Sequence, residues 1–302
     1  MKKQILAAAA FVMVGALAGC GGGSGSGTSA AGVAAVSGKV ADGYLVNATV
    51  FMDKNGNYKL DAGEPSTTTD ANGNYTLMVD SADIGKYPIV AMATQGVTMD
   101  KDTNQAVANS YLLSMPKFSV SGTVNSNFIS PMSTELREMM ETGKYASMQD
   151  AMIALSTKMK LPSGTNMMTD YINGQNGTMH TTAQNMATIM GSQMPQLFST
   201  SGGTTTLDVN RYRGMMGSIF SNMSSVRAAG NPTIMNNLIT NMTSYMSTII
   251  TGMPYRNMSS SYSGMMGGFA GTGGTMMGGT ATGGTSIGGT TMGGTATGGT
   301  MM

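Results

Sequence analysis

The sequence predicts an α+β chain, in which an antiparallel β-sandwich is followed by an all-α helical bundle and a disordered tail of Gly-Gly-Thr repeats. Three observations lead to this prediction. Residues 33–127 contain short β-branched runs between glycine and aspartate turns, residues 128–258 carry apolar side chains at spacings of three and four, and residues 259–302 repeat Gly-Gly-Thr. Repeats of that composition cannot bury enough apolar surface to fold.

The N-terminus has the pattern of a signal peptide over residues 1–19. Lys2 and Lys3 precede a weakly apolar run that is too short to span a bilayer. The run ends in Leu17-Ala18-Gly19-Cys20, which resembles the lipobox of bacterial lipoproteins, and Cys20 is the only cysteine in the chain. The alternative is an ordinary secretory peptide that happens to end at a cysteine.

The lipobox resemblance implies cleavage before Cys20 and lipidation of that residue with acyl chains such as palmitate. Several acyl chains make a membrane anchor effectively permanent. We therefore expect an exported protein of the cell envelope, with residues 20–32 as a flexible Gly/Ser tether. Gly21 is not the aspartate that, in such proteins, favours the inner membrane, so the outer membrane is favoured if the source is Gram-negative.

Strands are predicted where β-branched and aromatic residues gather between turn residues. The clearest runs are residues 48–52, 74–79 and 87–92, at the spacing typical of a β-sandwich. Helices are predicted from start signals as well as from periodicity. Ser130-Pro131 opens a helix that stops near Gly143, Ser147 opens a second one that ends before Pro162, and Asn231-Pro232 opens a third.

The third helix has the clearest apolar face. That face consists of Met235, Leu238, Ile239, Met242, Met246, Ile249 and Met253, and the opposite face is Asn, Thr and Ser. Residues 182–198 and 207–228 are expected to supply two more helices. On the helix that follows Pro131, the charged residues Glu135, Arg137 and Glu138 are interpreted as a solvated face.

The most specific chemical motif is a twelve-residue stretch from Asp53 to Glu64. Oxygen-bearing side chains occupy positions one, three, five, nine and twelve, which is the spacing by which one loop wraps oxygens around Ca²⁺. The predicted ligands are Asp53, Asn55, Asn57, the backbone carbonyl of Lys59, Asp61 and Glu64. Tyr58 departs from the EF-hand pattern, in which position six is normally glycine. The alternative is a polar turn that holds no ion.

The loop and the residues after it resemble the calcium-holding β-sandwich repeats of bacterial adhesins and the carboxypeptidase-regulatory-like domains. The resemblance covers roughly residues 37–79 and includes Glu64-Pro65 and the stretch 69–77. It implies a calcium-stabilised sandwich, with the weak affinity typical of extracellular modules.

Methionine suggests a second hypothesis, because the chain has 34 methionines and thioethers select Cu(I). The candidate copper ligands are Met167, Met168, Met179, His180, Met276 and Met277. On the helices, methionine is more often a core residue, since it fills irregular gaps. In the tail, copper capture, oxidant scavenging and a simple spacer all stay open.

Composition and motifs argue against catalysis and against nucleic-acid binding. Only 10% of the residues are charged and the formal net charge is +1, so no basic face is expected. His180 is the only histidine, and the chain has no nucleophile elbow, zinc motif or phosphate loop. We expect a non-catalytic, lipid-anchored surface scaffold or binding protein with a protein or polysaccharide partner. The alternatives are a Cu(I)-binding or oxidant-scavenging envelope protein and an adhesive protein that self-associates through its tail.

Overall fold

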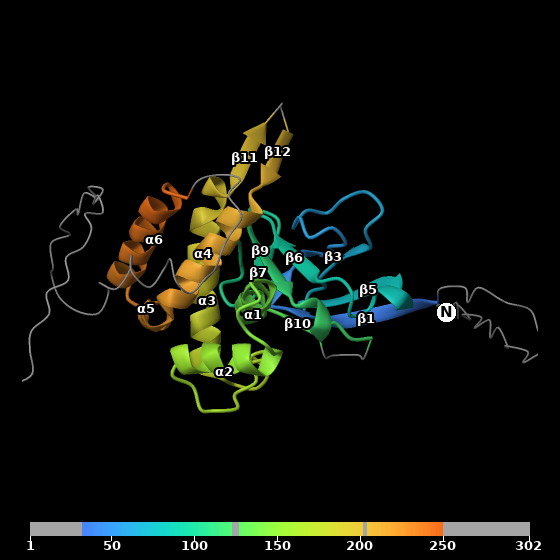
Figure 1. The fold of residues 1–302 in the computed structure, drawn as a ribbon, viewed down its shortest axis with the longest axis horizontal. Helices are drawn as coiled ribbons and strands as arrows, with labels where there is room; N and C mark the ends of the chain where they lie inside the picture. The colour runs from blue at the N-terminus through green and yellow to red at the C-terminus, as the bar shows by residue number, and fades with distance from the viewer. Residues whose placement is uncertain (1–31, 123–126, 202–203, 250–302) are drawn as a thin grey trace, which may run out of the picture.

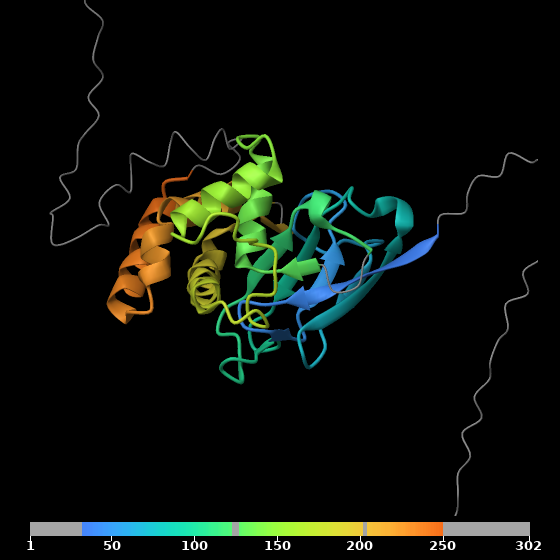
Figure 2. The same ribbon diagram turned by 90° about the horizontal axis from the view of Figure 1, so that it is seen from below.

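The computed structural model describes residues 32–122, 127–201 and 204–249. The predicted signal peptide, Cys20, the tether, Met253 and the Gly-Gly-Thr tail with Met276 and Met277 lie outside the described residues. Strands come first and helices follow, which confirms the predicted α+β order. Figures 1 and 2 show the strands of residues 33–129 at one end of the molecule and the helices of residues 148–246 toward the other. Helix α1 (Pro131–Glu141) packs against β9 (Tyr111–Met115) where the two parts meet.

The first ten described strands form three sheets with the orders β10-β1-β5, β4-β3-β6-β9 and β2-β7-β8. Their bounds are β1 Val33–Val40, β2 Leu45–Val46, β3 Thr49–Met52, β4 Ser66–Thr68, β5 Asn74–Asp80, β6 Ile89–Ala93, β7 Met99–Asp100, β8 Gln105–Ala106, β9 Tyr111–Met115 and β10 Asn127–Ile129. Short 3₁₀ turns follow β5 (Ser81–Asp83) and β9 (Lys117–Ser119).

One sheet is mixed, whereas the sequence predicted only antiparallel strands. β1 pairs with β5 antiparallel but with β10 parallel, in the register Gly38↔Asn127. The close approach needs a glycine, because a Cβ on Gly38 would lie 1.7 Å from the carbonyl oxygen of Asn127. A contact between residues so distant in sequence leaves no local pattern, so the parallel strand could not be predicted.

The three helices with start signals begin where the sequence placed them. Ser130 caps α1 and forms a capping box with Ser133, Ser147 caps α2 (Met148–Lys158), and Asn231 caps α6 (Pro232–Met246). Gly143 follows the end of α1 with a φ of 70°, the left-handed conformation that commonly ends a helix. These predictions are confirmed because capping depends on residues within one turn of each other.

The remaining helices differ from the prediction. Helix α3 (Gly177–Gln193) starts earlier than residue 182, with Asn176 as its cap, and a 3₁₀ turn (Met194–Gln196) follows it. The stretch 207–228 divides into α4 (Val209–Ser221) and α5 (Met223–Ala228). A hairpin of β11 (Phe198–Ser201) and β12 (Thr204–Leu207) lies between this 3₁₀ turn and α4, so the predicted all-α region contains strands. The sequence feature that could have predicted this hairpin is the pair Gly202-Gly203, which stands between two threonine- and serine-rich runs.

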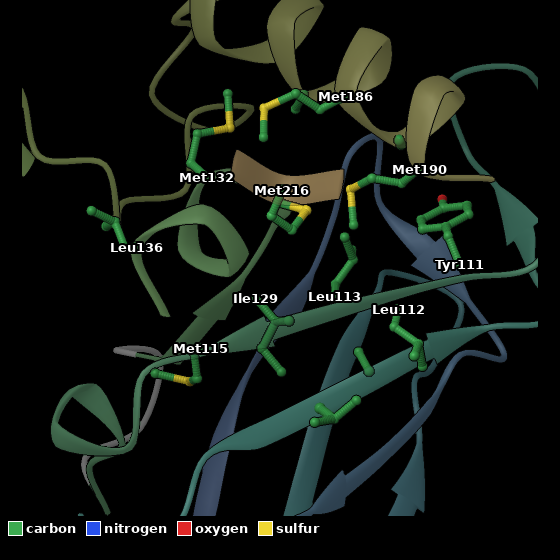
Figure 3. Packing of buried hydrophobic residues seen from close by; sticks show 14 of the residues in the cluster. Tyr111, Leu112, Leu113, Met115, Ile129, Met132, Leu136, Met186, Met190 and Met216 are labelled. Atoms are coloured by element: carbon green, nitrogen blue, oxygen red, sulfur yellow. The ribbon is translucent and has the colours of Figure 1, made fainter. Parts of the chain in front are cut away.

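A continuous hydrophobic core joins the strands to the helices. Figure 3 shows Met186, Met190 and Met216 of the helices on the side of the strands that carries Leu113 and Ile129. All five are fully buried. Met242 and Met246 of α6 are buried too, and Met235 packs against the core, as the periodicity predicted. Methionine therefore supplies much of the packing between the two parts.

Candidate functional site

The stretch 53–64 follows β3, and its backbone N–H groups donate hydrogen bonds to side chains of the same stretch. Asp53 is fully buried. Its Oδ1 accepts the backbone N–H groups of Gly56 and Asn57 at 2.8 and 3.1 Å, and its Oδ2 accepts that of Tyr58 at 3.2 Å. One carboxylate thus organises the first half of the loop.

The side chains at positions three, five and nine converge. The amide groups of Asn55 and Asn57 donate to Oδ2 of Asp61 at 2.8 and 2.6 Å. The Asn55 bond, followed by the Asn57 bond, lowers the pKa of Asp61, so this carboxylate is ionised at neutral pH. The oxygens of both asparagines accept backbone N–H groups from residues two positions later. Three of the predicted ligands are therefore neighbours in space.

Glu64 stands at position twelve of the calcium-type spacing, where the last side chain is expected to close the loop. Its Oε1 accepts the backbone N–H of Lys54 at 2.7 Å and its Oε2 accepts that of Asp61 at 3.1 Å. The side chain of Lys59 extends into solvent, and its Nζ lies 4.0 Å from Oδ1 of Asp61. The two carboxylate oxygens of Glu64 therefore link the beginning of the loop to its end.

Tyr58 takes the backbone conformation that glycine would supply at position six. Its φ is 60°, in the left-handed region. Its hydroxyl donates to Glu138, and its ring lies 4.8 Å from that of Tyr212 in α4. These contacts explain why a tyrosine stands where the EF-hand pattern has glycine: the side chain fixes the loop to the helices.

Arg137 of α1 connects the loop to a buried network of charges. Its Nη2 lies 3.2 Å from Oδ2 of Asp53, and its Nε lies 2.8 Å from Oε1 of Glu141. The guanidinium also stacks on the ring of Tyr58, 4.0 Å from the ring centroid. Arg213 of α4 pairs with Glu141 and, at 3.3 Å, with Glu138.

The network corrects the interpretation of α1 as carrying a solvated charged face. Glu135, Arg137 and Glu138 are at most 1% exposed. Burial raises the pKa of Glu138, and burial raises that of Glu135 well above its ordinary value. The sequence could not reveal this burial, because the contacts to Arg137 and Glu138 come from the distant loop and from α4.

The loop residues fit Ca²⁺ in part. The asparagine oxygens, Asp61 and Glu64 are of the type that hard cations prefer. Asp53, however, already faces the positive charge of Arg137. Within residues 32–122, 127–201 and 204–249, no three His, Cys, Asp or Glu side chains form a cluster that could hold a metal ion. A calcium ion would therefore depend on Asp61, Glu64 and the two asparagines.

The candidate copper ligands do not share one environment. Met167 and Met179 are buried core residues, and Met168 packs against the core. His180 uses its Nε2 to contact Oδ2 of Asp102 at 2.6 Å, and its ring lies 5.8 Å from that of Tyr171. These positions favour the interpretation of Met167, Met168 and Met179 as core residues.

Comparison of the chain with family models, curated proteins and solved structures gives no match. Among the described helices, none is long and apolar enough to cross a membrane.

Proposed function

We propose that this protein is a non-catalytic, lipid-anchored scaffold or binding protein of the cell envelope, stabilised by Ca²⁺ bound in the loop 53–64. The observation that carries the proposal is the attachment of this loop to α1, through Asp53 with Arg137 and Tyr58 with Glu138. A cation that rigidifies the loop would also rigidify the contact between strands and helices. Its role would be structural, in the manner of the calcium sites of extracellular modules.

The lipobox sequence around Cys20 supports the envelope location, and the first strand begins at Val33, directly after the predicted tether. The partner would be a protein or a polysaccharide at the cell surface. Metabolic labelling with a palmitate analogue tests the anchor: label should enter the protein and be lost in Cys20→Ala. Label retained in that variant would contradict lipidation at Cys20.

The sheets β10-β1-β5 and β4-β3-β6-β9 would be the two layers of the proposed β-sandwich. Support comes from alternation along β5, where Tyr75, Leu77 and Val79 are buried and the residues between them are exposed. Val50 and Phe51 of the second sheet belong to the same hydrophobic cluster.

Calcium binding is tested on the mature chain, residues 20–302, with Cys20→Ser to omit the lipid. Calorimetry and thermal unfolding are measured with and without calcium. The variants are Asp61→Asn and Glu64→Gln, which leave the Asp53–Arg137 pair intact. The matched control is Asp70→Asn, since Asp70 also accepts backbone N–H groups in a tight turn but lies outside the loop.

With a Kd of about 0.1–1 mM, roughly 10 mM Ca²⁺ should stabilise the fold by about 1.4–2.7 kcal/mol. We expect this gain in the parent chain and in Asp70→Asn, and its loss in the two loop variants. No uptake of calcium at millimolar concentration, or an equal gain in the Asp61 variant, would contradict the proposal.

A further inference from the structure

A second acidic site lies away from the loop, at the turn between β1 and β2. The turn is Asp42-Gly43, closed by a bridge between Ala41 and Tyr44. Asp42 is 8% exposed. The hydroxyl of Tyr111 donates to its Oδ2 at 2.9 Å, and its Oδ1 is buried with no hydrogen-bond partner in the structure. Such an unsatisfied buried oxygen is costly unless a ligand supplies a donor.

Two further carboxylates approach the same turn from the β7–β8 hairpin. A Cβ built on Gly43 would lie 2.4 Å from Oδ1 of Asp100 and 2.4 Å from Oδ2 of Asp102. Only glycine can therefore occupy position 43 while both carboxylates stay in place. Two carboxylates of the β7–β8 hairpin therefore lie beside the turn that carries the buried Asp42.

The positive charges near this cluster do not neutralise all of it. The Nζ of Lys101 is turned away and donates to Ala71 O and to Oδ1 of Asn72, both at 3.0 Å. His180 contacts Asp102, while the oxygens of Asp100 accept the backbone N–H of Asp102 and the hydroxyl of Thr103. Among the residues that the structure describes, Asp42 and Asp100 therefore accept hydrogen bonds from hydroxyl and backbone groups and not from a cation.

A cavity of about 250 Å³ opens on Asp42 and Asp100. Polar groups in its wall come from Tyr111, Asn109, Thr103, Gln105 and Thr188. The rest of the lining includes small apolar residues from the strand side and from α3, namely Ala106, Val107, Ala108, Ala187 and Gly191. Acidic groups at one place and apolar walls around them are complementary to a cationic group on an aliphatic stem.

We infer that this cavity binds the primary ammonium group of a small ligand or of a lysine side chain, with Asp42 and Asp100 as acceptors and the apolar walls around its stem. An ammonium carries three donors and forms charge-assisted bonds of about 2.7–2.9 Å. A divalent metal fits less well, because no cluster of three His, Cys, Asp or Glu side chains suited to a metal occurs in the described residues. The inference does not depend on the calcium loop.

The electrostatics of Asp42 support an occupant of positive charge. Burial, followed by repulsion from Asp100, raises the pKa of Asp42 to about 7. The groups that face Asp42 are Asp100 and Asp102 from the β7–β8 hairpin, Tyr111 from β9 and Tyr171, which donates to the backbone of the turn. An ammonium would favour the ionised form, so its affinity should rise with pH through about 7.

The test uses the mature chain with Cys20→Ser and measures binding by calorimetry and by NMR shifts. The probe is n-butylammonium, which should bind in the millimolar range. Two control compounds are n-butanol, which lacks the charge, and butyltrimethylammonium, which lacks the N–H donors. Asp42→Asn and Asp100→Asn should each weaken binding by about tenfold or more, as expected for loss of a charged hydrogen bond. The control variant Asp150→Asn removes a carboxylate at the start of α2 and should leave affinity unchanged.

The two sources of the ammonium group are separated by a second comparison. A peptide with one central lysine that binds as tightly as n-butylammonium indicates a protein partner, and a peptide that fails while the free amine binds indicates a small ligand. The inference is overturned if n-butylammonium does not bind, if butyltrimethylammonium binds equally well, or if both aspartate variants keep full affinity. Competition by Ca²⁺ or Mg²⁺ at micromolar concentration would overturn it in favour of a metal.

Discussion

Replacing Arg137 by methionine should strongly destabilise the protein, because Arg137 is the cation between the loop and α1. The side chains of Arg137 and Asp53 are 1% and 0% exposed. Removing one partner of such a pair leaves the other charge buried and uncompensated, at a cost of about 3–5 kcal/mol. The stacking of the guanidinium on Tyr58 adds to this loss. Since small domains have total stabilities of about 5–15 kcal/mol, the change is large.

The assay is urea denaturation at neutral pH of the parent, Arg137→Met, Asp53→Asn and the double variant. The expected signature is a lower midpoint with an unchanged slope, and a coupling free energy of at least about 2 kcal/mol between the two sites. The matched control is Arg227→Met, because Arg227 is a partly buried arginine that donates to the carbonyl of Met159. A loss below about 1 kcal/mol in Arg137→Met, or additive single changes, would refute the argument. The Asp53→Asn variant keeps the test informative if Arg137→Met does not fold.

Three further predictions concern single buried or strained residues. The pKa of Asp42 is about 7 in the folded chain and about 3.8 in the unfolded chain. The folded state therefore binds the proton more tightly, and this stabilises the fold fully below pH 3.8. The stabilisation is lost as the pH rises to about 7, by up to ~4 kcal/mol. Asp42→Asn should flatten that part of the stability curve, and urea midpoints that follow the same pH dependence in both proteins would contradict this. Glu135→Met should stabilise the fold by about 1–3 kcal/mol, because both carboxyl oxygens of Glu135 are buried without a partner; a lower midpoint would show that the carboxyl is satisfied. Lys160→Gly should raise stability by roughly 1 kcal/mol, because Lys160 has a φ of 53° after the end of α2, and thermal unfolding that is unchanged would contradict the strain argument.

The loop 53–64 shows which contacts the spacing of polar residues in the sequence can predict and which it cannot. Its side-chain oxygens cap its own backbone as the spacing suggests, because every one of those bonds joins residues within the twelve positions. The departure at Tyr58 could be seen in the sequence, but its purpose could not. That purpose is a contact with Glu138, eighty positions further along the chain.

The sequence by itself determined the order of strands and helices, the starts of α1, α2 and α6, and the methionine face of α6. These features follow from caps and periodicities that act within one or two turns of the chain. Only the tertiary structure decided that Glu135, Arg137 and Glu138 are buried, because a charge pattern on a helix does not reveal which neighbours cover it. The tertiary structure also brought Asp42 and Asp100 to one cavity, since hairpins that are distant in sequence meet only when the core beneath them packs.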